Sequence, residues 1–279
     1  MRLTGKAKLA GVMGWPVGHS RSPRLHGFWL ERHRIDGAYV PLAVRPEHAV
    51  QAIRALPALG FAGCNVTVPH KETALATADE ADMVARRIGA VNTLVVLPDG
   101  TIHGMNTDAH GFLANLQQRA PGWRVNAGPA VVLGAGGAAR AVVAALIDVG
   151  APQVRVVNRN VARAEALAKS IGGPVRVMPW ESRAATLGDA ALLVNTTTLG
   201  MTGQPPLDLS LDKLPLNAVV NDIVYVPLET DLLHRARERG NTVVDGIGML
   251  LHQARPGFAA WFGVEPAVDE ALRRAVLEG

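Results

Sequence analysis

The sequence has little cysteine, few aromatic side chains and no block of like charges. A single cysteine, Cys64, excludes a disulfide within the 279-residue chain and is consistent with a reducing compartment. Aromatic residues make up 4%, and 28 Lys and Arg against 24 Asp and Glu leave a net charge of +4 spread along the chain. Because nucleic-acid surfaces gather basic residues into patches, we expect no nucleic-acid partner.

Long apolar runs are also lacking. The most apolar helical candidate, residues 138–151, is interrupted by Arg140 and Asp148, well short of the ~18 residues that a membrane span needs. The first ten residues carry three basic side chains, and no unbroken apolar stretch follows them. We therefore expect a soluble, cytoplasmic protein with no membrane partner, in which Cys64 is a small buried residue.

Short apolar runs alternate with longer segments at helical spacing, the pattern of βα units in a largely parallel sheet. The length favours two domains, each with its own core, and the expected fold class is α/β. The first part of the chain predicts strands at 9–13, 39–44 and 63–68, helices at 22–33 and 47–56, and a hairpin of 93–97 with 101–105.

A second βαβ series is expected after a helix at 107–119 and a polar, Gly- and Pro-containing connection at 121–129. Six strands suit a doubly wound sheet of the Rossmann type. They are expected at 130–133, 154–157, 175–178, 192–195, 218–222 and 242–245.

A glycine-rich turn joins the first of these strands to a helix in the pattern G-x-G-x-x-A. Gly134 would make the tight turn, Gly136 would let the backbone approach a pyrophosphate, and Ala139 would allow the helix to pack closely on the strand. The helix N-terminus would then face the anion. The alternative is an ordinary glycine-rich turn, but the strand before it and the helix after it favour dinucleotide binding.

The end of the next strand, Asn158 and Arg159, bears on which dinucleotide is bound. A protein that binds NAD carries Asp or Glu near this position to hold the ribose 2′-hydroxyl. Here Asn158 can donate hydrogen bonds and Arg159 can pair with a 2′-phosphate, so NADP is expected. The alternative for Arg159 is a solvated arginine at the surface.

Residues 65–71 predict the end of a strand, Pro69 in the first turn of a helix, and Lys71 two residues inside that helix. A cation near the positive end of a helix dipole suits a lysine that acts as an acid or base, although an exposed lysine beginning a helix is equally compatible. Asp108 is the candidate partner, or else an N-cap. Asn92 offers both a donor and an acceptor to a hydroxylated substrate.

Together these motifs closely resemble those of the shikimate dehydrogenase family. The resemblance implies reversible, NADP-dependent reduction of 3-dehydroshikimate to shikimate (EC 1.1.1.25), a step of aromatic amino-acid biosynthesis, in the cytoplasm. The matching segments are 14–23, 65–71, 89–93, 106–108, 134–138, 195–197, 222–227 and 246–253.

The resemblance also implies a role for each matching residue, and no metal. Lys71 would be the catalytic acid/base, paired with Asp108. The substrate carboxylate would be held by Ser20 and Ser22, with Tyr225 close by, and the ring hydroxyls by Thr67, Asn92, Asp108 and Gln253. The expected NADP contacts are Gly134, Ala135, Gly136, Gly137, Ala138, Asn158, Arg159, Asn160, Arg163, Ile223 and Gly246.

A discontinuous first domain is implied as well, with residues 1–108 completed by 248–279 and an NADP domain at 109–247. The active site would lie in the cleft between the two domains, in a monomer or a homodimer. Apolar helical stretches at 257–262 and 265–277 agree with a returning C-terminal segment.

The sequence departs from the family pattern at Gly27, Asn160 and Ile223. Three alternatives stay open. The first is a quinate/shikimate dehydrogenase of broader substrate or cofactor range, or another NADP-linked reductase with this two-domain layout. The others are a noncatalytic NADP-sensing relative and a protein that binds nucleic acid through its modest positive charge. The presence of both Lys71 and Asp108 counts against a noncatalytic protein.

Overall fold

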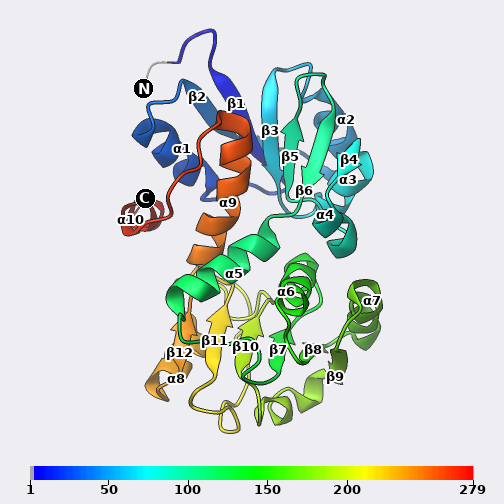
Figure 1. Cartoon of the computed structure of the whole chain (residues 1–279), viewed down its shortest axis with the longest axis vertical. Helices are drawn as coiled ribbons and strands as arrows, with labels where there is room; N and C mark the ends of the chain where they lie inside the picture. The colour runs from blue at the N-terminus through cyan, green and yellow to red at the C-terminus, as the bar shows by residue number, and fades with distance from the viewer. Residues whose placement is uncertain (1–2, 279) are drawn as a thin grey trace. The chain divides into compact units, whose positions relative to one another are not determined.

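The structure, a computed structural model, describes residues 3–278 and divides into two compact units (Figure 1). One unit runs as far as Thr107 and resumes at Leu250, and the other is Asp108–Met249. Each unit contains one six-stranded sheet with helices packed against it. The predicted α/β fold class is confirmed.

The sheet of the first unit is mixed, with strand order β2-β1-β3-β5-β6-β4. β1, β2 and β3 are parallel, whereas β5 and β6 form the predicted antiparallel hairpin. Its turn contains Gly100 at φ +87°, a conformation that favours glycine. The strands are β1 Lys8–Gly14, β2 Gly37–Ala43, β3 Phe61–Val66, β4 Glu80–Ala81, β5 Thr93–Val96 and β6 Ile102–Met105.

Helices of the first unit cover a core that includes Met13, Ile53 and Leu94. Cys64 is buried in this core as expected, and burial raises the pKa of its thiol to about 12. The helix expected at 47–56 is instead a 3₁₀ turn, Pro46–His48, followed by a shorter α-helix. The α-helices are α1 Ser22–Arg32, α2 Ala49–Ala55, α3 Lys71–Thr77, α4 Met83–Ile88 and α10 Glu270–Leu277.

The C-terminal segment completes the first unit through α9, Ile247–Phe262, from Leu250 onward. Trp261 Nε1 donates to the backbone oxygen of Leu94 at 2.9 Å. Gly63 lies directly beneath, since a Cβ added there would meet Trp261 Nε1 at 2.3 Å. The helix predicted at 257–262 is too short, because α9 begins at Ile247 and continues through Pro256; its Trp261 ring packs against Tyr39 of β2.

The second unit has a fully parallel sheet in the order β12-β11-β10-β7-β8-β9. The strand order reverses direction between β7 and β10, as in a Rossmann fold, so the predicted doubly wound sheet is confirmed. Each predicted strand end lies within one residue of the observed one. The strands are β7 Ala130–Leu133, β8 Val154–Asn158, β9 Val175–Pro179, β10 Leu192–Asn195, β11 Val219–Asp222 and β12 Thr242–Val244.

The core of the second unit includes Val131, Leu193 and Val220, and their strands β7, β10 and β11 are buried at every position, as expected for strands covered on both faces. Its α-helices are α5 Asp108–Arg119, α6 Gly137–Asp148, α7 Val161–Ile171 and α8 Asp231–Glu238, with 3₁₀ turns at Trp180–Ser182 and Ala185–Leu187. In the described residues 3–278, no helix has the length and apolar character required to span a membrane.

Candidate active site

A buried network of amides and hydroxyls lies at one edge of the first sheet, centred on Asn92. Asn92 Oδ1 accepts from the backbone N–H of Thr107 at 2.9 Å and from Thr93 Oγ1 at 3.0 Å. Its Nδ2 donates to Thr107 Oγ1 at 3.0 Å and to Gln253 Oε1 at 3.3 Å. These bonds fix which way the Asn92 amide faces, and they bring together two predicted substrate residues, Asn92 and Gln253, from distant parts of the chain.

Asn65, Tyr39 and His26 extend this network. The Tyr39 hydroxyl donates to Asn65 Oδ1 at 2.6 Å, and Asn65 Nδ2 donates to Thr93 Oγ1 at 3.1 Å. The Tyr39 ring stacks on His26 with centroids 3.9 Å apart. Burial raises the pKa of Tyr39 and lowers that of His26 to about 3, so both are neutral near pH 7.

Sequence reasoning missed the contribution of Tyr39 and His26. His26 belongs to α1 and Tyr39 to β2, and neither residue is among the predicted site residues. β1 pairs with β2, which carries Tyr39, and with β3, which carries Asn65. This strand order brings the two side chains within hydrogen-bonding distance. Only the position of Asn65 at the start of the 65–71 motif could have drawn attention to this part of the network.

Lys71 is the first residue of α3, and not two residues inside a helix that includes Pro69. The backbone N–H of Ala74 donates to the His70 oxygen at 2.8 Å, which makes His70 the N-cap. The His70 ring is held by the Val44 oxygen at 2.7 Å. The predicted helix start was therefore too early, although Lys71 does lie in the first turn, near the positive end of the helix dipole.

Backbone bonds place Lys71 beside the Asn92 network. The Val91 N–H donates to the Lys71 oxygen at 2.9 Å, and the Asn92 N–H donates to the Met105 oxygen at 3.0 Å. Lys71 is half-buried, whereas Asn92 is buried. Lys71, the candidate proton donor, comes after β3, and Asn92, the candidate partner of the ring hydroxyls, directly precedes the neighbouring antiparallel strand β5, so both lie at the same end of these two strands.

The other predicted substrate residues of this unit lie in the segments that follow β1 and β3. Ser20 and Ser22 come after β1, and the Ser22 N–H donates to Ser20 Oγ at 3.3 Å. Ser22 is buried. Thr67 comes directly after β3, and its N–H donates to the Met13 oxygen at 2.9 Å.

Asp108 and Tyr225 belong to the second unit. Asp108 is the first residue of α5, so this helix begins one residue later than predicted. Tyr225 lies in the segment that follows β11 and is partly exposed. The predicted pairing of Asp108 with Lys71, and of Tyr225 with the substrate carboxylate, stays a prediction.

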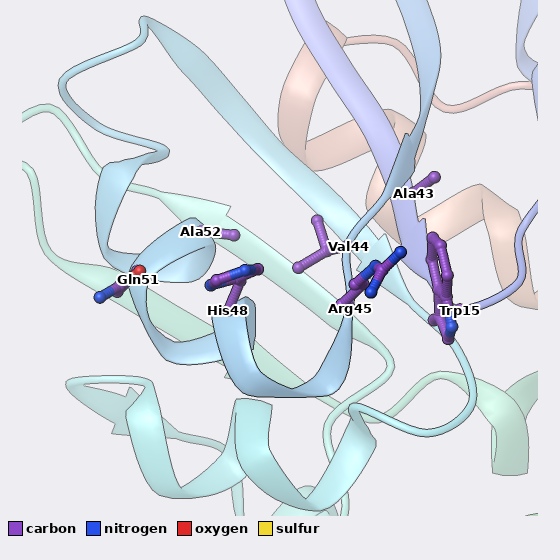
Figure 2. Close-up of a pocket in the computed structure, with 7 residues that line it drawn as sticks. All are labelled: Trp15, Ala43, Val44, Arg45, His48, Gln51 and Ala52. Atoms are coloured by element: carbon purple, nitrogen blue, oxygen red, sulfur yellow. The ribbon is translucent and has the colours of Figure 1, made fainter.

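A separate hollow of ≈ 560 Å³ lies past the ends of β1 and β2, where its lining side chains come from three chain segments (Figure 2). The guanidinium carbon of Arg45 lies 5.3 Å from the centroid of the Trp15 ring, a cation–π contact. The lining residues are Trp15, Ala43, Val44, Arg45, His48, Gln51 and Ala52. None of them is a predicted substrate residue.

The glycine-rich turn of the second unit has the predicted geometry. Gly134 has φ +109°, and a Cβ added there would lie 2.7 Å from Thr196 Oγ1, so glycine is required. Gly136 is the N-cap of α6, and a Cβ added to Gly137 would meet nothing within 4 Å. Ala139 is fully buried. The first N–H groups of α6 are therefore open to an anion, as a pyrophosphate requires.

The segment after β8 is folded onto this turn. Asn160 is the N-cap of α7, and its Oδ1 accepts from the Arg163 N–H at 3.0 Å. Asn158 Nδ2 donates to the Asn160 oxygen at 2.8 Å, and Arg163 Nε donates to the Ala135 oxygen at 3.0 Å. Arg159 is exposed. Hydrogen bonds within this segment thus occupy Asn158 Nδ2 and Asn160 Oδ1, while the Arg163 side chain lies against the glycine-rich turn.

Ile223 and Gly246 lie together at the same end of the second sheet. The Ile223 N–H donates to the Asn195 oxygen at 3.1 Å. A Cβ added to Gly246 would meet the Ile223 oxygen at 2.2 Å, so this close approach requires glycine. Predicted cofactor residues therefore follow β7, β8, β11 and β12, although their contacts with a cofactor stay a prediction.

A parallel sheet in this order, with a glycine turn where the strand order reverses, defines a dinucleotide-binding protein of the Rossmann class. Two family models match the chain. The shikimate dehydrogenase substrate binding domain matches residues 12–94, and the shikimate / quinate 5-dehydrogenase model matches residues 116–200. The chain belongs to the shikimate dehydrogenase family, and the resemblance inferred from its motifs is confirmed.

Individual relatives agree over nearly the whole chain. A shikimate dehydrogenase (NADP(+)) of Paramagnetospirillum magneticum is 66% identical, over 99% of this chain and 100% of the relative. The structure of shikimate 5-dehydrogenase from Thermus thermophilus, in complex with NADP(H) and shikimate, is 39% identical with a TM-score of 0.85, covering 96% of this chain and 99% of that one. A quinate dehydrogenase from Corynebacterium glutamicum, in complex with NAD, is 30% identical with a TM-score of 0.91, covering 98% and 99%.

Proposed function

We propose that the chain is an NADP-dependent shikimate dehydrogenase that reversibly reduces 3-dehydroshikimate to shikimate in aromatic amino-acid biosynthesis. The observation that carries the proposal is the buried Asn92–Thr107–Gln253 network beside Lys71. A small polyol acid needs convergent amides and hydroxyls, and not an apolar slot. The 66% identical relative named for this activity supports the same substrate.

NADPH, when bound, supplies the hydride. In the direction of reduction, the Lys71 ammonium would donate a proton to the developing alkoxide, and in oxidation its amine would accept the hydroxyl proton. Asp108 would orient Lys71 and the ring. Asn92, Thr67 and Gln253 would bind the ring hydroxyls, while the hydroxyl groups of Ser20 and Ser22 would hold the carboxylate.

The residues of the second unit fit NADP. The open backbone at Gly136 and Gly137 suits a pyrophosphate. Asn158, Arg159 and Asn160 end β8 without a carboxylate, so nothing at this strand end repels a 2′-phosphate. Arg159 and Arg163 would supply positive charge, with Arg163 already placed against the glycine turn.

Lys71→Ala tests the proposal. We expect wild-type protein to give NADPH absorbance with NADP⁺ and shikimate, and the variant to lose roughly 10²- to 10⁴-fold in kcat, the usual range for a general acid/base. Lys169→Ala, at an exposed position of α7, is the control. The proposal would be contradicted if the wild-type protein oxidised only quinate and only with NAD⁺, or if kcat fell only a few-fold in Lys71→Ala.

Domain roles, location and assembly are part of the same proposal. Residues 1–108 with 248–279 would bind the substrate, 109–247 would bind NADP, and the protein would be a cytoplasmic monomer or homodimer. Light scattering on the protein as it elutes from a size-exclusion column measures its molar mass and so its oligomeric state. A stable tetramer would contradict this part of the proposal.

A further inference from the structure

Asp222, the last residue of β11, has a fully buried carboxylate with three hydrogen-bond donors. Its Oδ1 accepts from Asn195 Nδ2 and from the Val224 N–H, each at 3.0 Å, and its Oδ2 accepts from Thr230 Oγ1 at 2.7 Å. Burial raises the pKa of Asp222 to about 6. Because burying a carboxylate is costly, these donors are needed to keep it in place.

The three donors come from three different segments. Asn195 ends β10, Val224 belongs to the segment after β11, and Thr230 is the N-cap of α8. Thr230 Oγ1 also accepts from the Leu233 N–H at 3.4 Å. A single carboxylate therefore holds the 223–230 segment near its beginning and at its end.

Asp222 and its hydrogen-bond donors are also joined to the glycine-rich turn. Asn195 Oδ1 accepts from Thr197 Oγ1 at 2.7 Å, and the neighbouring Thr196 Oγ1 donates to the Leu133 oxygen at 2.6 Å, one residue before Gly134. Asp222 thus fixes the 223–230 segment relative to the turn expected to hold the pyrophosphate. That segment carries Ile223 and Tyr225.

We propose that Asp222 is a positioning residue, which holds Ile223 and Tyr225 where the reacting end of the bound cofactor and the substrate carboxylate need them. This inference rests on the proposed function. The phosphate end of the cofactor would depend on the glycine turn and Arg163, whose bond to the Ala135 oxygen does not involve Asp222. Loss of Asp222 should therefore separate catalysis from cofactor affinity.

Asp222→Ala and Asp222→Asn test the inference in the full-length protein. In Asp222→Asn the side-chain oxygen can still accept from Asn195 and Val224, while its amide donates to Thr230 Oγ1. We expect Asp222→Ala to lower kcat about 10-fold or more and to raise the KM for shikimate, with the Kd for NADP⁺ within about 2-fold of wild type. Asp222→Asn should recover most of the kcat.

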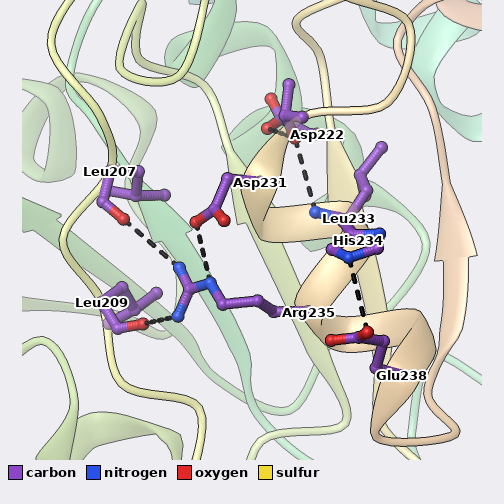
Figure 3. A network of polar contacts seen from close by, with 9 residues as sticks. Leu207, Leu209, Asp222, Asp231, Leu233, His234, Arg235 and Glu238 are labelled. Atoms are coloured by element: carbon purple, nitrogen blue, oxygen red, sulfur yellow. Dashed lines mark hydrogen bonds and ion pairs between the residues drawn. The ribbon is translucent and has the colours of Figure 1, made fainter.

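The control is Asp231→Asn, in the first turn of α8, where the exposed carboxylate pairs with Arg235 at 2.8 Å (Figure 3). This variant should keep wild-type kcat and KM. If Asp222→Ala does not fold, Thr230→Val removes one bond to the carboxylate and is judged by the same three measurements.

Two results would overturn the inference. One is a folded Asp222→Ala protein with wild-type kcat and KM, and the other is a loss of kcat and of NADP⁺ affinity in proportion to the folded fraction measured by circular dichroism. Wild-type protein that binds NADP⁺ but does not oxidise shikimate would instead contradict the proposed function.

Discussion

Tyr39 has no proposed role in binding or catalysis, yet the hydrogen-bond network of the candidate substrate site depends on it. Its hydroxyl donates to Asn65 Oδ1, and Asn65 in turn donates to Thr93 Oγ1, which donates to Asn92 Oδ1. Each bond fixes the orientation of the next amide or hydroxyl. Tyr39 is thus linked to the side-chain amide of Asn92 through three consecutive hydrogen bonds.

We expect Tyr39→Phe to raise the KM for shikimate several-fold and to destabilise the protein by about 1–3 kcal/mol, the cost of an unpaired buried acceptor. Steady-state kinetics and urea unfolding measure the two effects.

Thr77→Val is the matched control. It also removes a buried hydroxyl, which bonds the Thr73 oxygen at 2.7 Å within α3. Thr77→Val should reduce stability but leave KM unchanged. An unchanged KM in Tyr39→Phe as well would show that the Asn65 amide keeps its orientation without Tyr39.

At the scale of single residues, the sequence indicated which polar side chains belong to the candidate site, but not the hydrogen bonds that join them. Asn92 and Gln253 come together in the structure, and Gly134 has the left-handed backbone that its predicted turn demands. Tyr39 could not be found in this way, because its importance arises from a partner on a different strand. For Lys71, the motif indicated the start of a helix, but the capping role of His70 carried no recognisable signature.

At the scale of elements, α7 connects helix capping to cofactor recognition. Asn160 caps the helix through the N–H of Arg163, whose side chain then reaches the Ala135 oxygen in the glycine turn. The start of this helix therefore determines where a cation lies beside the expected pyrophosphate.

Asn160→Ala should destabilise the protein by roughly 0.5–2 kcal/mol, the usual cost of losing an N-cap, and should also raise the Kd for NADP⁺. Fluorescence titration measures this affinity. Asp82→Ala removes the N-cap of α4 in the other unit and should reduce stability without changing the Kd. Equal NADP⁺ affinities in the two variants would refute a link between the cap and Arg163.

The elements of the second unit were more predictable than those of the first. β7, β10 and β11 are buried along their whole length and appear in the sequence as continuous apolar runs, and the ends of all six strands lie within one residue of expectation. In the first unit, β4 has only two residues and α4 only six, too short for periodicity to show. Asp82 and Gly89 at the two ends of α4 are capping signals that could have revealed it.

At the scale of the whole molecule, ligand binding and stability are linked. NADP⁺ at about 100 times its Kd should stabilise the folded protein by about 2.7 kcal/mol and raise Tm accordingly. If Arg159 pairs with the 2′-phosphate, the same concentration of NAD⁺ should raise Tm less. Calorimetry with each dinucleotide measures the difference, and equal shifts would refute a preference for NADP.

The fold class and the family were predictable because several motifs occur in a fixed order along a regular α/β pattern. The approach of Lys71 to Asp108 stays a prediction, since it joins side chains of two units and depends on no local pattern.

The long interval between Thr107 and Leu250 has a consequence for biosynthesis. Asn92 bonds a glutamine 161 positions later, and Gly63 lies against Trp261 near the end of the chain. During translation, the middle segment can finish its parallel sheet as soon as β12 leaves the ribosome. The N-terminal sheet must wait, with an uncovered apolar face, until roughly the last thirty residues emerge.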